Sequence, residues 1–255
     1  MEIRRFIIIT SLFITTHNVM AQTQVIAHRG FWKIDGSAQN SLTSLEKADS
    51  IGCYGSEFDV WLAEDNELVV NHDNSYKGKN MEKTPSTELA TLKLKNGENL
   101  PTLKQYLKKG EKLKTHFILE LKEHSTPERE TEAIQKIISM VKGMGLTDRM
   151  EYISFSLHAI KEFIRLAPKG TPVFYLEGSL SPQQLKEVGA TGADYHLSVF
   201  KKNPDWIAEC HKLGLKVNVW TVNKSEDFQW SINNKVDYIT TNEPVLLQEE
   251  LKISK

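Results

Sequence analysis

Short apolar runs alternate with amphipathic helical patterns along most of the chain, and this alternation constrains the fold more than any other feature. The second half is the most regular: Pro172–Leu176 is followed by a helical pattern over Pro182–Val188, and Tyr195–Val199 by one over Pro204–Leu213. A glycine comes directly after each of these two helical patterns, as is typical of helix C-termini. Repeated strand–helix units of this length predict a parallel sheet with helices outside it.

The rest of the chain continues the same alternation. The other predicted strands are Val25–Ala27, Ser56–Leu62, Leu68–Asn71, Phe117–Leu121, Tyr152–Phe155, Lys216–Thr221 and Tyr238–Thr240. The other predicted helices are Ser41–Ile51, Pro101–Lys109 (with Gly110 after its end), Pro127–Met144, His158–Leu166, Ser225–Ile232 and Val245–Leu251.

These strands are one more than an eight-stranded barrel requires, and we interpret Leu68–Asn71 as a short extra partner of Ser56–Leu62. We therefore expect an α/β fold, a (β/α)8 TIM barrel, in one domain over residues 22–255. Residues 74–100 contain no clear element and predict a small insertion after the second strand region. A doubly wound open sheet is the alternative, although the chain has no glycine-rich phosphate loop.

Residues 1–21 carry the pattern of a secretory signal peptide. Two arginines precede the apolar stretch Phe6–Thr16, and Val19 and Ala21 place small residues where a cleavage site needs them. The stretch is too short to cross a bilayer, which takes about 20 apolar residues. The alternative is an apolar N-terminal strand. We expect cleavage near Ala21 and a periplasmic or secreted protein without stable membrane insertion.

Composition excludes several classes of protein. The chain has 32 Lys and Arg against 33 Asp and Glu, so no basic excess indicates a nucleic-acid partner. Two cysteines, Cys53 and Cys210, are too few for a disulfide-dense scaffold or a cysteine-based zinc site. An oxidising compartment permits a disulfide between them, but we expect two buried free thiols. Nothing in the sequence indicates the oligomeric state.

Three carboxylates are candidates for a metal site. Glu57 and Asp59 lie two residues apart on a predicted strand, so their side chains point to one face. Like charges this close repel unless a cation lies between them, and Glu120 offers a third oxygen ligand. An all-oxygen site suits Ca²⁺ or Mg²⁺. The alternative is that each carboxylate pairs with Arg29 or Lys122.

Two histidines and two cations accompany these carboxylates. His28 and His72 each follow a predicted strand, and two imidazoles form a natural pair of general acid and base. Taken alone, a histidine at a strand end is more often a hydrogen-bonded structural residue. Arg29 offers a planar fork for phosphate, and Lys122 offers a point charge. Together with a divalent cation, these residues indicate a site for an anionic phosphoryl group.

An ordered set of motifs resembles the glycerophosphodiester phosphodiesterase family. The motifs are IAHRG with a later QN, EFDVWLAEDNELVVNHD, LPTL, LELK, WTVN and YITTNEP, between residue 25 and about residue 245. The resemblance implies a TIM barrel and the metal-dependent hydrolysis of small-molecule glycerophosphodiesters to glycerol 3-phosphate and an alcohol.

The resemblance also implies a role for each matching residue. Glu57, Asp59 and Glu120 would bind the metal, and His28 and His72 would be the acid and the base. Arg29 and Lys122 would hold phosphate oxygens. Asn40 would lie beside the phosphate and hydrogen-bond a neighbour. The alternative is that it caps the helix Ser41–Ile51, and the two roles are compatible. Trp220 would line the pocket against the glycerol, with core packing as the alternative.

Two positions depart from the family pattern, because Gln39 and Asn242 stand where the family usually has an acid. We interpret both as a change in substrate preference. Two other functions remain open: a membrane-acting phospholipase C- or D-like phosphodiesterase on a related barrel, and a non-catalytic barrel that binds a phosphorylated ligand.

Overall fold

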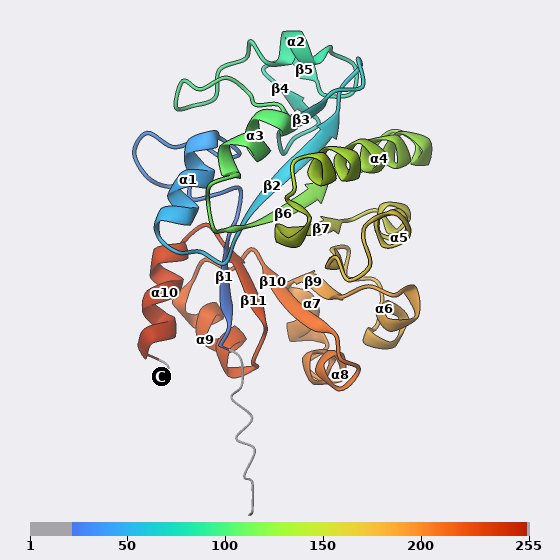
Figure 1. Cartoon of the computed structure of the whole chain (residues 1–255). Coiled ribbons are helices and arrows are strands. Elements are labelled where there is room, and N and C mark those ends of the chain that lie inside the picture. The colour runs from blue at the N-terminus through green and yellow to red at the C-terminus, as the bar shows by residue number, and fades with distance from the viewer. Residues whose placement is uncertain (1–21, 254–255) are drawn as a thin grey trace, which may run out of the picture.

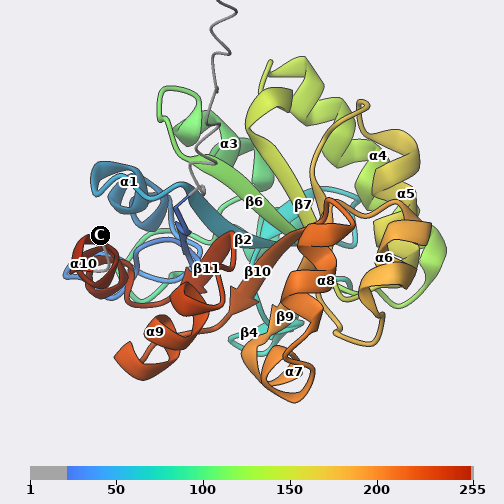
Figure 2. The same ribbon diagram turned by 90° about the horizontal axis from the view of Figure 1, so that it is seen from below.

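The computed structural model describes residues 22–253, in which eight parallel strands close into a barrel surrounded by helices (Figures 1 and 2). The strands pair in chain order, and β1 pairs with both β2 and β11 to complete the ring. They are β1 (Gln24–Ala27), β2 (Gly55–Leu62), β6 (His116–Leu121), β7 (Met150–Ser154), β8 (Val173–Tyr175), β9 (Gly192–His196), β10 (Lys216–Trp220) and β11 (Tyr238–Thr241). This confirms the expected (β/α)8 barrel.

Helices follow the barrel strands and cover their outer faces (Figure 2). Several begin at a capping side chain: the Ser41 hydroxyl accepts from the Ser44 backbone, and Thr102 and Gln105 form a capping box. The helices are α1 (Leu42–Ser50), α3 (Leu103–Gly110), α4 (Pro127–Gly143), α5 (Leu157–Leu166), α6 (Pro182–Val188), α7 (Leu197–Lys202), α8 (Trp206–Lys212), α9 (Ser225–Asn233) and α10 (Pro244–Ile253), with a 3₁₀ turn at Thr147–Arg149.

Alternation along each strand separates the core from the site. On β2, Phe58 and Val60 belong to the large apolar core, whereas Glu57 and Asp59 lie on the opposite face, inside the barrel. A smaller apolar cluster occupies the barrel interior and includes Ile26, Ile118, Ile153 and Phe174. Polar residues therefore accumulate above this cluster, at the carboxyl ends of the strands, where TIM barrels carry their active sites.

The surplus strand and the insertion form a separate cap at one end of the barrel, near the top of Figure 1. β3 (Leu68–Val70) runs antiparallel to β2, which confirms that it is an extra partner and not a barrel strand. The segment after it contains a two-stranded hairpin, β4 (Ser75–Tyr76) and β5 (Lys79–Asn80), and the short helix α2 (Ser86–Leu89). A third apolar cluster that includes Trp61, Met81, Leu89 and Leu100 holds the cap together.

One predicted strand was placed too late along the chain. Tyr195–Val199 was expected to be extended, but β9 ends at His196 and α7 begins at the next residue. The His196 side chain accepts a hydrogen bond from the Ser198 backbone and caps this unexpected helix. The apolar residues of this segment therefore lie partly on a helix, where Phe200 is buried.

The helix expected over Pro101–Lys109 begins and ends slightly later. Its last residue is Gly110, which was expected to follow the helix as a stop signal. A Cβ at this glycine would lie 2.3 Å from the Phe117 ring, so the glycine is required for close packing of α3 on β6.

Cys53 and Cys210 are both buried and free, as expected. Among the described residues, no helix is long and apolar enough to cross a membrane. The expected signal peptide, residues 1–21, lies outside the described residues.

Candidate active site

The first element of the site is the tight turn that follows β1. Arg29 has a φ of 58° and Gly30 a φ of 74°, both in the left-handed region. A Cβ at Gly30 would lie 2.4 Å from the Ser44 hydroxyl oxygen, so only glycine allows the turn to pack on α1. The turn also directs the Arg29 backbone N–H at Glu57, where it donates to Oε2 at 2.7 Å. The HRG sequence therefore orients a carboxylate through its backbone.

Three carboxylates meet inside the barrel. Glu57 and Asp59 project from β2, and Glu120 projects from β6, where it is the register partner of Asp59. One oxygen from each lies within 4.8 Å of the others, and all three side chains are buried. This is the candidate metal-ligand set expected from the sequence.

Two cations lie against these carboxylates. Lys122 Nζ lies 2.5 Å from Glu120 Oε1 and 3.4 Å from Asp59 Oδ1. Arg29 Nε lies 3.8 Å from Asp59 Oδ2, which is too long for a hydrogen bond. The alternative interpretation, simple pairing of acids with cations, is thus correct for Asp59 and Glu120 but leaves Glu57 without a side-chain cation.

The pKa values of the three carboxyl groups, those of Glu57, Asp59 and Glu120, differ because their surroundings differ. Burial and the neighbouring Asp59 and Glu120 raise the pKa of Glu57 well above its ordinary value. Burial and Asp59 also raise the pKa of Glu120 to about 7, although Lys122 opposes the rise. Burial acts on Asp59 too, but Lys122, His72 and Arg29 outweigh it and hold its pKa below the ordinary value. A divalent cation would offset the repulsion among these groups.

Two buried polar atoms of the site have no hydrogen-bond partner: Glu57 Oε1 and Arg29 Nε. An unpaired carboxylate oxygen beside two other carboxylates fits a hard divalent cation such as Ca²⁺ or Mg²⁺. An unpaired guanidinium donor fits an anionic oxygen. The residues present are therefore suited to bind both a metal ion and a phosphate group.

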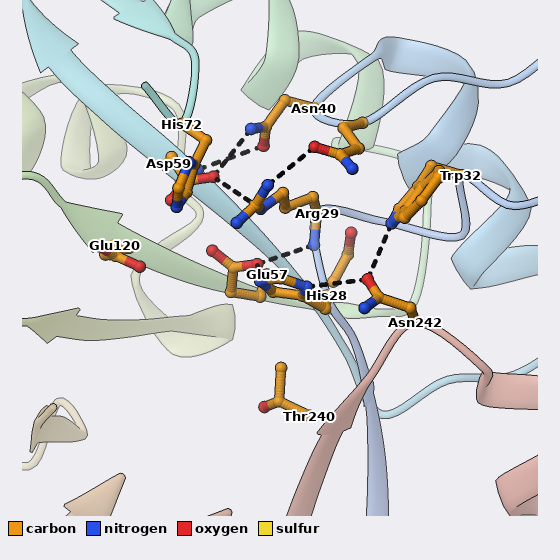
Figure 3. A network of polar contacts seen from close by, with 12 residues as sticks. His28, Arg29, Trp32, Asn40, Glu57, Asp59, His72, Glu120, Thr240 and Asn242 are labelled. Carbon is orange, nitrogen blue, oxygen red and sulfur yellow. Dashed lines mark hydrogen bonds and ion pairs between the residues drawn. The ribbon is translucent and has the colours of Figure 1, made fainter. Parts of the chain in front are cut away.

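His28 is held by a residue that departs from the family pattern. Its Nδ1 atom lies 2.9 Å from Oδ1 of Asn242, and the Trp32 indole donates to the same oxygen at 3.0 Å (Figure 3). Its Nε2 atom lies 4.0 Å from Glu57 Oε2. Burial and the adjacent Arg29 lower the pKa of His28 to about 4. His28 is therefore a neutral imidazole near neutral pH.

His72 reaches the site from β3, the extra strand that the sequence predicted. It does not follow a parallel barrel strand, because β3 is antiparallel to β2 and leads the chain back toward Asp59. The Asn71 backbone donates to the Asp59 carbonyl at 3.0 Å and holds the chain there. His72 Nδ1 lies 2.7 Å from the Asp73 carboxylate, and His72 is near enough to Asp59 to help lower the pKa of that carboxyl group.

Asn40 and Gln39 support the central residues. Asn40 Nδ2 donates to Asp59 Oδ2 at 2.8 Å and thereby orients that carboxylate. The expected alternative, that Asn40 caps α1, is wrong because the Ser41 hydroxyl caps it. Gln39 Oε1 accepts from Arg29 Nη1 at 2.8 Å, so the amide that replaces the family's acid still positions the guanidinium.

A cavity of about 110 Å³ opens between these groups. Polar groups line one part of it, including His28, Arg29 and Glu57, and an apolar wall of Ile153, Phe155, Leu176 and Trp220 lines the other. Trp220 thus lines the pocket as expected, and its indole donates to the Asp194 carbonyl at 2.8 Å.

The sequence reasoning missed four residues of this region: Trp32, Asp194, Asn218 and Thr240. Trp32 donates to Asn242 and also lines an outer cavity together with Gln39 and His72. Asp194 and Thr240 line the cavity, and Asn218 donates to the Thr240 hydroxyl at 2.8 Å. Placement of the strand at Gly192–His196 would have directed the Asp194 side chain into the barrel.

Comparison with known proteins identifies the family. The model of the glycerophosphoryl diester phosphodiesterase family matches residues 28–246. The chain belongs to this family. A crystal structure of a glycerophosphodiester phosphodiesterase from Parabacteroides distasonis is 52% identical, with a TM-score of 0.90, over 92% of this chain and 98% of that one.

Other relatives agree with this assignment. A glycerophosphodiester phosphodiesterase of Caldanaerobacter subterraneus is 28% identical over 240 residues, covering 89% of this chain and 96% of its own length. An Oleispira antarctica phosphodiesterase, solved in complex with the product sn-glycerol-3-phosphate, shares the fold with a TM-score of 0.79 at 24% identity, over 91% of this chain and 97% of that one. The comparisons therefore place this protein in a family of phosphodiesterases.

Proposed function

We propose that the protein hydrolyses glycerophosphodiesters to sn-glycerol 3-phosphate and a free alcohol, with His28 and His72 as the proton-transferring groups. The observation that carries this proposal is that both imidazoles, the unpaired Arg29 donor and two of the three clustered carboxylates, Glu57 and Glu120, line one small cavity. The structure of the Oleispira antarctica phosphodiesterase in complex with the product sn-glycerol-3-phosphate is in keeping with this proposal.

His28 is suited to act as the general base. An indole N–H can only donate, so the shared atom of Asn242 must be its carbonyl oxygen, and His28 Nδ1 must donate to it as well. Nε2 then carries the lone pair and faces the carboxylate cluster. With a pKa near 4, His28 stays unprotonated across the neutral range and is ready to accept a proton from a hydroxyl group.

His72 is suited to act as the general acid. The Asp73 carboxylate accepts from Nδ1 and compensates the charge of a protonated ring. His72 also lies at the edge of the cavity, where it borders a second, outer cavity of about 370 Å³ beneath the cap. The alcohol that leaves the phosphorus can receive its proton from His72 at this boundary.

Glu57, Asp59 and Glu120 would hold a divalent cation, Ca²⁺ or Mg²⁺. When bound, such an ion neutralises phosphate charge and acidifies a coordinated hydroxyl group. Arg29 and Lys122 add positive charge on either side of this cluster and bind phosphate oxygens. Asn40 and Gln39 act on the substrate indirectly, since they orient Asp59 and Arg29.

We also propose that the protein is exported to the periplasm or the medium after cleavage behind Ala21. The charged start, the short apolar stretch and the small residues before the cleavage point support this proposal. N-terminal sequencing of the protein recovered from its native host should begin at Gln22, and an intact Met1 would contradict export by this route.

The test is hydrolysis of glycerophosphocholine, glycerophosphoethanolamine and glycerophosphoinositol, with coupled detection of glycerol 3-phosphate. A protein that consists of residues 22–255 would be assayed with Ca²⁺, with Mg²⁺ and with EDTA. We expect metal-dependent release from at least one diester and no release in EDTA. Folded, metal-bound protein that releases glycerol 3-phosphate from none of them would overturn the proposal.

A further inference from the structure

Asp194 is a buried acid that the proton-transfer chemistry does not use. It lies on β9, its side chain points into the barrel, and only 2% of its surface is exposed. Its Oδ1 atom has no hydrogen-bond partner. Because an unpaired buried polar atom costs free energy, its presence in a cavity wall indicates that a ligand group completes it.

The surroundings of Asp194 define the kind of ligand. It lines the cavity beside Trp220 and Thr240, and in Figure 3 Thr240 lies below Glu57 and His28, away from the Asn40 and His72 end of the site. Asn218, its register partner on β10, also has an unpaired side-chain oxygen, Oδ1. The unpaired Asp194 oxygen lines the cavity beside an apolar wall, which is complementary to a small molecule with carbon on one side and a hydroxyl donor on the other.

The charged groups that act on Asp194 are two acids, Glu120 and Glu151, so this end of the cavity does not attract an anion. Burial raises the pKa of Asp194 to about 8, although hydrogen bonding from Asn218 opposes the rise. The cations Arg29 and Lys122 instead interact with Asp59 and Glu120. The phosphate group is therefore expected at the Arg29 end of the cavity, and the neutral part of the substrate at the Asp194 end.

We propose that Asp194 determines specificity by accepting a hydrogen bond from the terminal hydroxyl group of the glycerol moiety, the hydroxyl farthest from phosphorus. This inference rests on the proposed function, since it assumes that the glycerol phosphate half of the substrate occupies the small inner cavity. It makes the enzyme selective for fully deacylated glycerophosphodiesters, because an ester at that hydroxyl removes the donor and adds a chain that the cavity of about 110 Å³ does not hold.

The test compares two substrates that differ in this hydroxyl alone. One is glycerophosphocholine, and the other is the phosphocholine diester of propane-1,2-diol, which keeps the middle hydroxyl and ends in a methyl group. The wild-type kcat/KM should favour glycerophosphocholine by roughly 10- to 100-fold, as expected when a buried acceptor is left unpaired. Asp194→Ala should lose this preference, with a large fall for glycerophosphocholine and a small change for the analogue.

Two further variants separate recognition from structure. Asp194→Asn keeps an acceptor oxygen in the same place, so it should retain a larger substrate preference than Asp194→Ala. Glu151→Gln is the matched control, because Glu151 is also a buried acid inside the barrel but does not line the cavity; it should keep the full wild-type preference. Equal losses on both substrates in Asp194→Ala, or no preference in the wild type, would overturn the proposal and leave a bound water as the completing group.

A binding measurement distinguishes failure of this inference from failure of the proposed function. Calorimetric titration with sn-glycerol 3-phosphate and with propane-1,2-diol 1-phosphate requires no turnover. We expect wild-type protein to bind the glycerol compound roughly 10- to 100-fold more tightly and Asp194→Ala to bind the two alike. Equal affinities in the wild type would overturn the role of Asp194 even in an active enzyme, whereas absent hydrolysis with this preference intact would count only against the proposed function.

Discussion

Asn242 Oδ1 lies 2.9 Å from His28 Nδ1 and also accepts the Trp32 indole N–H, so one amide oxygen determines which nitrogen of His28 carries the proton. From the sequence, Asn242 was interpreted as a departure that alters substrate preference. The structure gives Asn242 a role in orienting His28, and the change in substrate preference stays a prediction. An amide performs this role without adding a negative charge to a site that already holds three carboxylates.

Replacement of Asn242 should therefore impair turnover more than substrate binding. In Asn242→Ala, His28 loses its acceptor and its tautomer is no longer determined, so kcat should fall roughly 10- to 100-fold with little change in KM. Asn242→Asp keeps an acceptor and should retain more activity than Asn242→Ala. Steady-state kinetics of both variants checks this, and an Asn242→Ala variant with wild-type kcat would contradict it.

The proton-transfer roles of His28 and His72 can be tested with substrates that differ in their leaving group. If His72 protonates the leaving alcohol, His72→Ala should lose roughly 10²–10⁴ in kcat on glycerophosphocholine but far less on a p-nitrophenyl diester, whose leaving group needs no proton. His28→Ala should be impaired on both substrates. The reverse pattern would exchange the two roles.

Glu57→Gln should separate metal binding from stability. The variant removes one of three buried carboxylates. Loss of a residue that only orients a metal ligand lowers metal affinity roughly 10- to 100-fold. Loss of a ligand itself should lower the affinity for Ca²⁺ or Mg²⁺ by more. Because burial and its neighbours raise the pKa of Glu57, the ionised group destabilises the metal-free protein. The metal-free variant should melt at the same temperature or higher. Unchanged metal affinity by calorimetry would exclude Glu57 as a ligand.

A second buried acid, Glu151, predicts how stability depends on pH. It lies on β7, where the Tyr54 hydroxyl donates to it, and burial raises its pKa from 4.5 to about 7. The folded protein therefore holds a proton that the unfolded chain has lost between these values. The contribution of Glu151 to stability falls as the pH rises through this range and then stays low.

Glu151→Gln keeps an acceptor for Tyr54 but cannot ionise. Its melting temperature relative to wild type should increase from about pH 5 to about pH 7 and then level off, with a gain in free energy on the order of 3 kcal/mol at most. Thermal melts in a series of buffers check this. A difference that is independent of pH would show that Glu151 ionises in the folded protein as it does in water.

The parts of the site that were predictable from the sequence come from adjacent or alternating residues. His28 and Arg29 follow a strand directly, and the spacing of Glu57 and Asp59 places both on one face of β2. These relationships are local, so the chain order determines them. Glu120 was predictable for the same reason, since it lies on a clear barrel strand.

The parts that were not predictable depend on contacts between distant segments. His72 was predicted to follow the extra strand, but its approach to Asp59 depends on the pairing of β2 with β3, and Asn242 meets His28 across 214 positions of sequence. Asp194 was missed because the strand that carries it was placed from residue 195 onward, which left the acid in an expected loop. A single acid in a short strand has no local pattern that marks it as part of a cavity.

The most direct test of the account is release of glycerol 3-phosphate from glycerophosphocholine under metal saturation, by the wild type, His28→Ala and His72→Ala. The account predicts clear turnover by the wild type and losses of roughly 10²–10⁴ in each variant, with melting temperatures close to that of the wild type. Full activity in either variant, or no release by folded, metal-bound wild-type protein from this or any other glycerophosphodiester, would contradict it.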